Sequence, residues 1–315
     1  MRRKKNTQKP KNLTFKHIFS ADFKRNNQLY LMMIPVIAYF VVMCYLPMYG
    51  ALIAFMDYRP SLGFWGSDWV GLKNFVSFLT LPSFGSIFMN TVRISIATLL
   101  FGFPAPIILA LLMHEVHCKP FLKITQNITY LPHFISLVVV CGLIKEFTKS
   151  DGLIGDLVAM FGGTPVSLLN YAENFVPIYV VSNIWQEVGW GTIIYLAALT
   201  SIDRQLYEAA EIDGAGKFKQ MLHVTLPGIV PTIIIMLTMR MGQMLNVGYE
   251  KIILLYNDAV MSRADVISTY VYRKGLIDLD WSFSTAVGLF NSVINFALLI
   301  FVNGLNKRLQ SSSLW

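Results

Sequence analysis

The feature that most constrains this chain is its long apolar runs without a charged side chain. The run Leu29–Met56 contains no Asp, Glu, Lys or Arg. A helix that crosses the hydrocarbon core of a bilayer needs about 20 mostly apolar residues. Charged residues make up 14% of the chain, whereas soluble domains contain roughly 25%. The sequence therefore indicates a polytopic membrane protein and argues against a soluble globular enzyme.

Several segments are long and apolar enough to be transmembrane helices. The first is too long for the apolar region of a signal peptide and has no small-residue cleavage site after it, so we expect it to be retained. The predicted fold class is all-α, a polytopic membrane protein with six transmembrane helices. The six expected spans are Leu29–Met56, Phe84–Met113, Ile124–Ile144, Phe175–Ala198, Val224–Leu245 and Phe283–Val302.

The distribution of basic residues predicts the orientation of these spans. Six spans place both termini on one side, and the segments of that side contain 16 lysines and arginines against 8 in the opposite loops. Because loops rich in Lys and Arg stay in the cytoplasm, we expect both termini to be cytoplasmic. The expected organisation is a basic tail over 1–28, a six-span domain over 29–302 and a short cytoplasmic tail over 303–315. The charge of the first tail suits anionic lipid better than nucleic acid.

Sites that catalysis or nucleotide hydrolysis would require are not found in the sequence. Gly214–Phe218 is glycine-rich, but it lacks the first Gly of a phosphate-binding loop and has Phe where Ser or Thr would hold magnesium. The histidines of His114–His117 are too close for an HExxH zinc motif. Cys44, Cys118 and Cys141 have neither disulfide nor zinc spacing. We therefore expect no catalytic residue, metal or cofactor in this chain.

The segment between the fourth and fifth expected spans predicts a helical hairpin. Asp203 can cap the N-terminus of a helix that follows it, and Gly214 and Gly216 can end that helix. A second helix then enters the membrane with Pro227, which can bend the junction. The hairpin covers 203–227 on the cytoplasmic side.

This hairpin resembles the EAA loop of ABC importer permeases. Met221 and Val224 depart from the family pattern, in both cases by a conservative apolar change. The resemblance implies a coupling helix that docks on a separate ATPase subunit, in which ATP and Mg would bind. The residues that match the pattern in type and spacing are Glu208, Ala209, Ala210, Asp213, Gly214, Ala215, Leu226 and Pro227.

Other stretches resemble the type I, maltose-permease-like class of permeases. Within that class they resemble the subgroup that transports polysaccharides and complex oligosaccharides. They are Tyr45–Gly50, Asp265–Arg273, Ser284–Ser292 and Ser311–Trp315. The resemblance implies alternating access in a bacterial cytoplasmic membrane, with no catalysis in this chain. It implies as partners a second homologous permease, two ATPase subunits, an extracellular solute-binding lipoprotein, an oligosaccharide substrate and the lipid bilayer, but no nucleic acid.

Polar residues inside the expected spans are candidates for the substrate path, because an intramembrane charge is costly and usually faces a cavity. Amides and charges suit sugar hydroxyls, and aromatic faces suit sugar C–H surfaces. We expect Gln243 and Asn246 on the helical face of Arg240. The candidates are Arg240, Gln243, Asn246, Glu187, Trp185, Trp190, Asn291 and Asn295.

Each candidate also has a structural alternative. Arg240 could pair with Glu187 as a lock between two helices. The amides could hydrogen-bond between helices, and Trp185 and Trp190 could lie at the membrane interface.

The loop 246–282 is long for a bare connection, so we expect it to fold as short helices. Its tyrosines are candidates for docking an extracellular binding protein, with packing of the loop onto the spans as the alternative. They are Tyr249, Tyr256, Tyr270 and Tyr272.

Two other function classes fit the sequence less well. A secondary transporter of small polar solutes would need coupling-ion residues and internal repeats, and it would leave the hairpin pattern unexplained. A membrane-embedded transferase would need a polar catalytic cluster.

Overall fold

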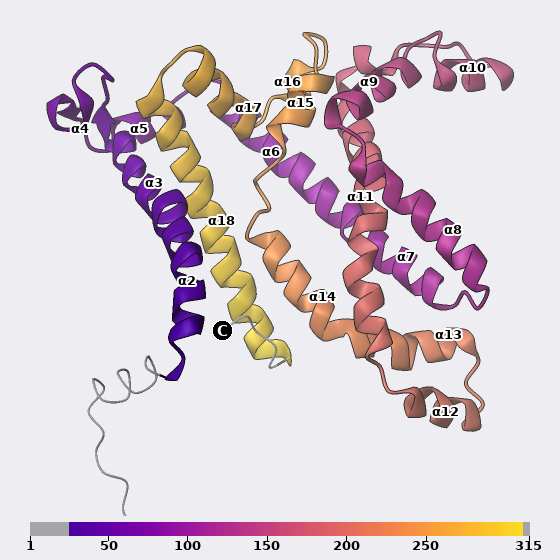
Figure 1. Ribbon diagram of the computed structural model, residues 1–315. Coiled ribbons are helices and arrows are strands. Elements are labelled where there is room, and N and C mark those ends of the chain that lie inside the picture. The colour runs from indigo at the N-terminus through magenta and orange to yellow at the C-terminus, as the bar shows by residue number, and fades with distance from the viewer. Residues whose placement is uncertain (1–24, 311–315) are drawn as a thin grey trace, which may run out of the picture. The chain divides into compact units, whose positions relative to one another are not determined.

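The computed structural model describes residues 25–310 of the chain. Most of the basic tail expected over 1–28 lies outside the described residues, as does the end of the chain from Ser311. The chain divides into two units, Met1–Leu52 and Ile53–Trp315. Their helices are labelled in Figure 1.

The first unit is helical throughout its described part. The helical run Asn27–Phe55 is long and apolar enough to cross a membrane. Its last helix, η2, extends into the second unit. The run consists of α2 (Asn27–Tyr39), the π-helical η1 (Phe40–Tyr45), α3 (Leu46–Met48) and the 3-10 helix η2 (Tyr49–Phe55).

The second unit begins with a small ordered loop. Strand β1 (Met56–Asp57) pairs antiparallel with β2 (Asp68–Trp69), and Asn74 donates hydrogen bonds to the carbonyls of Ala54 and Met56 at 3.0 and 3.1 Å. The helices of this loop are α4 (Gly63–Gly66) and α5 (Lys73–Leu79).

Three further helical segments are long and apolar enough to cross a membrane: Phe84–His114, Lys217–Met241 and Trp281–Lys307. With the run in the first unit they make four among the described residues. They consist of α6 (Phe84–Ala97), η3 (Thr98–Gly102) and α7 (Pro104–His114); of α13 (Lys217–Gln220), η7 (Met221–Thr225) and α14 (Leu226–Met241); and of α18 (Trp281–Gln310).

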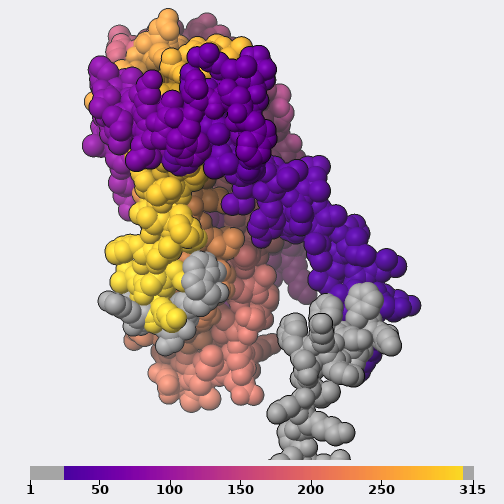
Figure 2. All heavy atoms as spheres, turned by 90° about the vertical axis from the view of Figure 1, so that its left-hand side faces the viewer, coloured from indigo at the N-terminus to yellow at the C-terminus, as the bar shows by residue number. Residues whose placement is uncertain are grey.

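Helix α18 shows the pattern expected of a helix that faces lipid on one side. Phe296 and Phe301 are 61% and 68% exposed, whereas Asn291 and Asn295 are buried. The space-filling view shows part of this helix, in yellow, at the surface (Figure 2).

The third expected span is not one straight helix. Helix α8 (Lys119–Tyr130) and η4 (Leu131–Phe134) are separated from α9 (Leu137–Phe147) by a bend of 100°. Ile135 and Ser136 adopt extended backbone angles, with ψ of 135° and 136°. Pro132 lacks the N–H that a continuous helix would need. Neither arm alone is long enough to cross a membrane, but the two arms together are long and apolar enough.

Helix α11 (Phe175–Thr200) corresponds to the fourth expected span. Its 26 residues are enough to cross a bilayer at about 1.5 Å per residue. It is not one of the four segments that are apolar enough over a sufficient length, because its middle carries polar side chains, among them Asn183, Gln186 and Glu187. The number of spans therefore depends on α11 and on the bent pair.

The remaining helices lie in two groups at opposite ends of α14 (Figure 1). Helix α12 (Arg204–Ile212) lies beside α13 at one end, and α15, α16 and α17 lie at the other. The expectation of short helices in the loop 246–282 is confirmed. Their bounds are α15 (Tyr249–Leu255), α16 (Met261–Ala264), α17 (Ile267–Tyr272) and the π-helical η8 (Arg273–Ile277), and the loop before α11 contains α10 (Leu153–Met160), η5 (Leu168–Asn170) and η6 (Ala172–Asn174).

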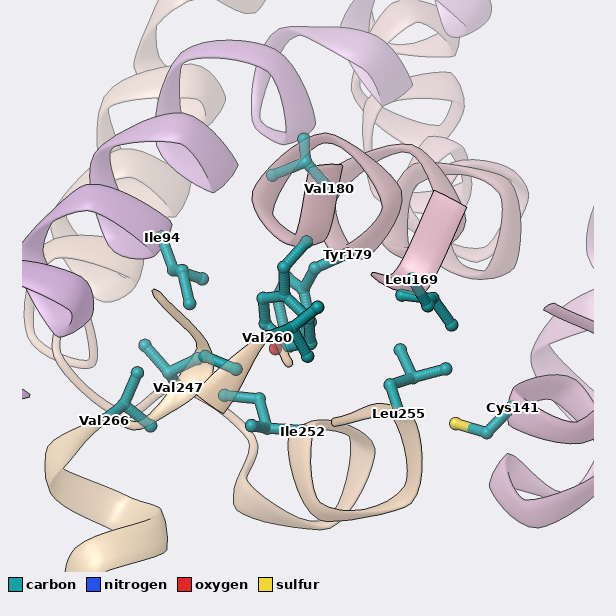
Figure 3. Close-up of a cluster of buried hydrophobic side chains, with 12 residues drawn as sticks. Ile94, Cys141, Leu169, Tyr179, Val180, Val247, Ile252, Leu255, Val260 and Val266 are labelled. Carbon is teal, nitrogen blue, oxygen red and sulfur yellow. The ribbon is translucent and has the colours of Figure 1, made fainter. Parts of the chain in front are cut away.

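Helices α15 and α16 are fixed to the long helices by a shared apolar cluster. Ile94 of α6, Tyr179 of α11 and Ile252 of α15 are buried in it with Val247 and Val266. Figure 3 shows their side chains converging around Tyr179 and Val260. The loop also contains a bidentate ion pair between Arg273 and Asp265, with distances of 2.8 and 2.6 Å.

Close helix contacts at α11 depend on two glycines. A Cβ at Gly189 would collide with the carbonyl oxygen of Thr129 in α8, and one at Gly191 would lie 3.0 Å from Pro106 of α7. Both neighbours can approach α11 only because these positions have no side chain.

We predict that Gly189→Ala lowers the midpoint of thermal unfolding in detergent. The added methyl group meets the backbone of α8, and such overpacking costs about 1–3 kcal/mol. Gly288→Ala in α18 is the matched control, because a Cβ there meets nothing within 4 Å. If both variants had the same midpoint, the close crossing of α8 and α11 would not exist.

Candidate functional site

A cavity of about 820 Å³ lies inside the second unit. It is bounded by α6, η3, η4, α11, α15 and the end of α14. Its volume falls in the range of small-molecule sites, roughly 300–1,000 Å³. Helix α14 contributes Arg240 to the lining, and the other end of this helix lies toward α13 and α12 (Figure 1).

One wall of the cavity carries a histidine that is paired with an acid and stacked on an indole. His133 Nδ1 lies 3.0 Å from Glu187 Oε2. The His133 ring lies parallel to that of Trp190, with centroids 4.5 Å apart and 3° between the planes. Phe134 meets Trp190 edge-on at 5.7 Å. This wall therefore combines an aromatic face with a hydrogen-bonding acid.

The bend of the third expected span brings His133 to this wall. His133 lies in η4, two residues before the extended backbone of Ile135. The sequence analysis missed it, because a lone histidine within an apolar run gives no signal unless the break is known. The proposed lock between Arg240 and Glu187 is not formed, since the partner of Glu187 is His133.

Arg240 lines the cavity from the last turn of α14. A cation there is favoured by the carbonyl dipoles at the end of the helix. Within the described residues its side chain has no hydrogen bond or ion pair, and it is exposed. Its guanidinium group therefore remains available to a ligand.

Lys251 of α15 is a second cation of the cavity wall. It is 4% exposed, and its Nζ has no hydrogen-bond partner among the described residues. The Nζ lies 5.5 Å from the ring centroid of Tyr179. Burial lowers the pKa of Lys251 to about 8, although nearby Cys141 and Glu187 raise it in part. The sequence analysis missed Lys251, because it assigned this segment to an outside loop.

Two buried hydroxyls of the same wall also lack partners in the part of the chain that is described. They are Ser95 Oγ and Thr98 Oγ1, on α6 and η3. Buried polar groups are nearly always hydrogen-bonded in proteins. The lining of this cavity therefore contains two hydroxyls and an ammonium whose hydrogen-bonding capacity is unused within the described residues.

The predicted helical face of Arg240, Gln243 and Asn246 is wrong. Helix α14 ends at Met241, and the chain continues in tight turns through Gln243 and Asn246. Asn246 lines the cavity, whereas Gln243 is exposed outside the lining.

Asn291 and Asn295 of α18 lie outside the cavity lining and hold the turn after α14. Their Nδ2 groups donate to Asn246 Oδ1 at 2.9 and 3.0 Å, and the backbone N–H of Leu245 donates to Asn295 Oδ1 at 2.9 Å. These contacts match the interhelical alternative for both residues. The Leu245 contact also replaces the backbone hydrogen bond that this N–H would make in a continuing helix.

The remaining candidates divide between surface and core. Trp185 is 46% exposed and lies outside the cavity lining. Tyr249 lines the cavity and stacks on Tyr272, with centroids 5.2 Å apart. Tyr270 is only 8% exposed, and Tyr256 packs against the buried cluster. The packing alternative therefore describes Tyr256 and Tyr270, and Tyr249 is exposed.

The expected hairpin has the geometry that its residues predict. Asp203 accepts a hydrogen bond from the backbone N–H of Gln205 at 2.9 Å and caps α12. Gly214 follows the helix with a φ of +74°. The backbone N–H of Ala215 donates to the carbonyl of Ala210, and that of Gly214 to the carbonyl of Glu211, at 2.9 and 3.0 Å. This is the Schellman ending of a helix, which favours glycine at the left-handed position.

The hairpin is tied to the base of α14. The Tyr207 hydroxyl donates to Thr225 Oγ1 at 3.0 Å, and Gln220 Nε2 donates to the carbonyl of Ala215 at 2.9 Å. Gln220 and Thr225 are both buried. Instead of a simple kink at Pro227, the junction has the π-helical turn η7 just before it.

The outer surface of the hairpin exposes both apolar and charged groups. Ile212 and Phe218 are 88% and 68% exposed, and Leu206 is 54% exposed. The side chain of Glu208 is 63% exposed, beside Arg204 at 3.7 Å. The hairpin thus exposes large apolar side chains that a protein partner could cover. Of the motif residues, Ala209, Asp213 and Pro227 are also exposed, and Ala210, Ala215 and Leu226 are partly buried.

Comparisons with known proteins give consistent results. Residues 18–311 match the family described as "Binding-protein-dependent transport system inner membrane component". Protein LplB of Bacillus subtilis (strain 168) is 44% identical over 296 residues, which cover 94% of this chain and 93% of LplB. The polygalacturonan/rhamnogalacturonan transport system permease protein YteP of the same organism is 43% identical over 288 residues, covering 91% and 90%.

A solved structure has the same fold. It is a chain in the crystal structure of a bacterial alginate ABC transporter in complex with an alginate pentasaccharide-bound periplasmic protein. The TM-score is 0.85 at 42% identity, over 93% of this chain and 99% of that chain.

We predict that Asn295→Leu destabilises the second unit. The change leaves the N–H of Leu245 without its acceptor and removes one donor from Asn246, and an unsatisfied buried group costs about 1–3 kcal/mol. The measurement is the midpoint of thermal unfolding of the purified protein. Gln243→Leu, in the same turn but exposed, should leave the midpoint unchanged. An equal effect of both changes would contradict the role of Asn295.

Proposed function

Since the chain belongs to the family of binding-protein-dependent transport system inner membrane components, we propose that it forms one half of the transport path of an ATP-driven oligosaccharide importer. It is a multi-pass permease subunit of the cytoplasmic membrane. The family description and the name of YteP both describe transport components that work with other subunits. They therefore argue against a secondary transporter and against a membrane-embedded transferase.

One observation carries the proposal: α14 joins the exposed hairpin to the cavity. At one end, Tyr207 and Gln220 tie the hairpin to the base of the helix. At the other end, Arg240 lines the cavity. A displacement of α12 is therefore transmitted through packed and hydrogen-bonded structure to the cavity wall, as coupling between distant sites requires.

The partners follow from this arrangement. The exposed patch of Leu206, Ile212 and Phe218, with Glu208 beside it, would dock on an ATPase subunit. Two such subunits would bind ATP and Mg and hydrolyse ATP, and this chain would hold neither. A second homologous permease would complete the path.

The same arrangement supports an orientation for the chain. The hairpin lies on the side that is rich in Lys and Arg, so both termini would be cytoplasmic. The bent pair α8–α9 and α11 would then be the third and fourth of six spans. The tail 1–28 would contact anionic lipid.

An extracellular solute-binding lipoprotein would deliver the substrate at the opposite end. Tyr249 and Tyr272 would contribute to its docking, because Tyr249 is exposed there and stacks on Tyr272. Tyr256 and Tyr270 would support that surface from beneath.

The substrate class follows from the cavity wall and from the relatives. The wall combines the aromatic face of Trp190 with the hydroxyls of Ser95 and Thr98 and with the amide of Asn246. Such a wall can cover sugar C–H surfaces and hydrogen-bond sugar hydroxyls. YteP is named for polygalacturonan and rhamnogalacturonan transport, and the structural relative for alginate.

We predict that Gly214→Val uncouples the transporter. A β-branched residue at a φ of +74° is strained by about 1–3 kcal/mol, so α12 loses its ending. Uptake into proteoliposomes that contain all subunits should fall to background. Sugar capture by the binding protein should not change, because that protein is separate.

The matched control is Gly216→Ala in the same hairpin. Gly216 has a φ of −68° and open space around its Cβ position. Uptake should stay within about twofold of the parent, as for a neutral surface change. Full uptake by Gly214→Val would refute the coupling role of the hairpin.

We also predict that Trp190→Ala lowers the uptake rate roughly tenfold, or about 1.4 kcal/mol, the order of one aromatic contact. Trp185→Ala removes the same side chain from the same helix outside the cavity lining, and should have little effect. The measurement is uptake of a labelled oligosaccharide at saturating binding protein. If Trp185→Ala were the more damaging change, the substrate would pass along another face of α11.

A further inference from the structure

The buried ammonium of Lys251 is the least satisfied group of the cavity. Its Nζ has no hydrogen-bond partner within the described residues, and the residue is 4% exposed. A buried charge without a partner is strongly unfavourable. Lys251 lies next to Ile252, which belongs to the buried cluster. Methionine would fill the same space at lower cost, so a folding role does not explain the lysine.

No carboxylate of the cavity wall forms an ion pair with this cation in the described part of the chain. The carboxylate of Glu187 is paired with His133 at 3.0 Å. Glu250 is exposed in the first turn of α15, where the helix N-terminus stabilises a negative charge. Arg240 adds a second cation without an ion pair in the described part. The free charge of the wall is therefore positive.

Two hydroxyls elsewhere in the cavity lining suit a polyhydroxylated ligand. Ser95 and Thr98 line the same cavity, and their buried hydroxyls have no hydrogen-bond partner among the described residues. A hydroxyl can donate to a carboxylate or accept from a sugar hydroxyl. An ammonium that donates to a carboxylate forms a charge-assisted hydrogen bond, about twice as strong as a neutral one.

We propose that Lys251 makes the cavity selective for acidic saccharides, by binding the carboxylate of a uronic acid residue as it passes. This rests on the proposed function, because it names the substrate class of the same cavity. Arg240 would serve as the second cation along the path. A neutral sugar would leave the ammonium unsatisfied and would cross less readily.

The test compares trigalacturonic acid with its fully methyl-esterified form, in which each carboxylate is replaced by an uncharged ester. The full complex, with its partner subunits and binding protein, is reconstituted in proteoliposomes. The quantity measured is the ratio of uptake of the acid to uptake of the ester. Because the binding protein is the same in every assay, its own preference cancels when variants are compared.

We expect Lys251→Met to lower this ratio about tenfold, the size of one charge-assisted hydrogen bond, with uptake of the ester retained. Lys251→Arg should keep most of the preference, because it keeps the charge. Lys145→Met is the matched control: Lys145 is exposed and lies outside the cavity lining. Without ligand, the complex with Lys251→Met should melt at the same temperature as the parent or higher.

Other results would overturn the inference. An unchanged ratio with continued uptake would show that Lys251 does not read the carboxylate, and would leave the proposed function intact. A lower melting temperature with equal loss of both uptakes would assign Lys251 a structural role. If the parent complex took up neither probe, and no saccharide stimulated its ATPase activity, the proposed function would fail together with the inference.

Discussion

The backbone hydrogen bond from Leu245 to the side chain of Asn295 illustrates the constraint on which this structure depends. In an apolar environment each backbone N–H and C=O needs a partner, so a helix can break only where another group replaces its hydrogen bonds. After Met241 the tight turns pair most of the backbone N–H groups, and Asn295 accepts from that of Leu245. The break is stable for this reason, and it allows Asn246 and Lys251 to reach the cavity.

The break at Ile135 follows the same logic with different residues. Pro132 has already removed one donor, so the helix loses less by ending there. The bend then turns α9 away and leaves His133 against Glu187 and Trp190. The cavity is thus built largely from the ends of helices, where side chains are not constrained to a regular helical face.

Sequence reasoning recovered the features that depend on local chemistry. The cap at Asp203, the left-handed Gly214 and the length of the apolar runs each follow from a few neighbouring residues. It did not recover contacts between distant segments. Such contacts join residues far apart in the chain: His133 pairs with Glu187, Lys251 is buried beside Tyr179, and Asn291 and Asn295 hydrogen-bond to Asn246. Arg240, which was selected because an intramembrane charge is conspicuous, lines the cavity, whereas its alternative pairing with Glu187 is not formed.

Helix α14 links the two functional ends of the molecule. Its base is tied to the hairpin that exposes Ile212 and Phe218, and its other end carries Arg240. The chemistry of the two ends is separate: one exposes apolar and charged side chains, where we propose that an ATPase subunit docks, and the other is the polar and aromatic cavity wall proposed for a sugar. A permease needs both, together with a rigid connection between them.

The most direct test of this account is the accessibility of the cavity during the ATP cycle. Cys44, Cys118 and Cys141 are replaced, and Asn183 of the cavity wall is changed to cysteine in the full complex. Labelling with a membrane-impermeant thiol reagent is then measured from each side. The account predicts labelling from the cytoplasmic side without nucleotide, and from the outside when ATP and loaded binding protein trap the closed ATPases. Labelling that does not depend on nucleotide would contradict it.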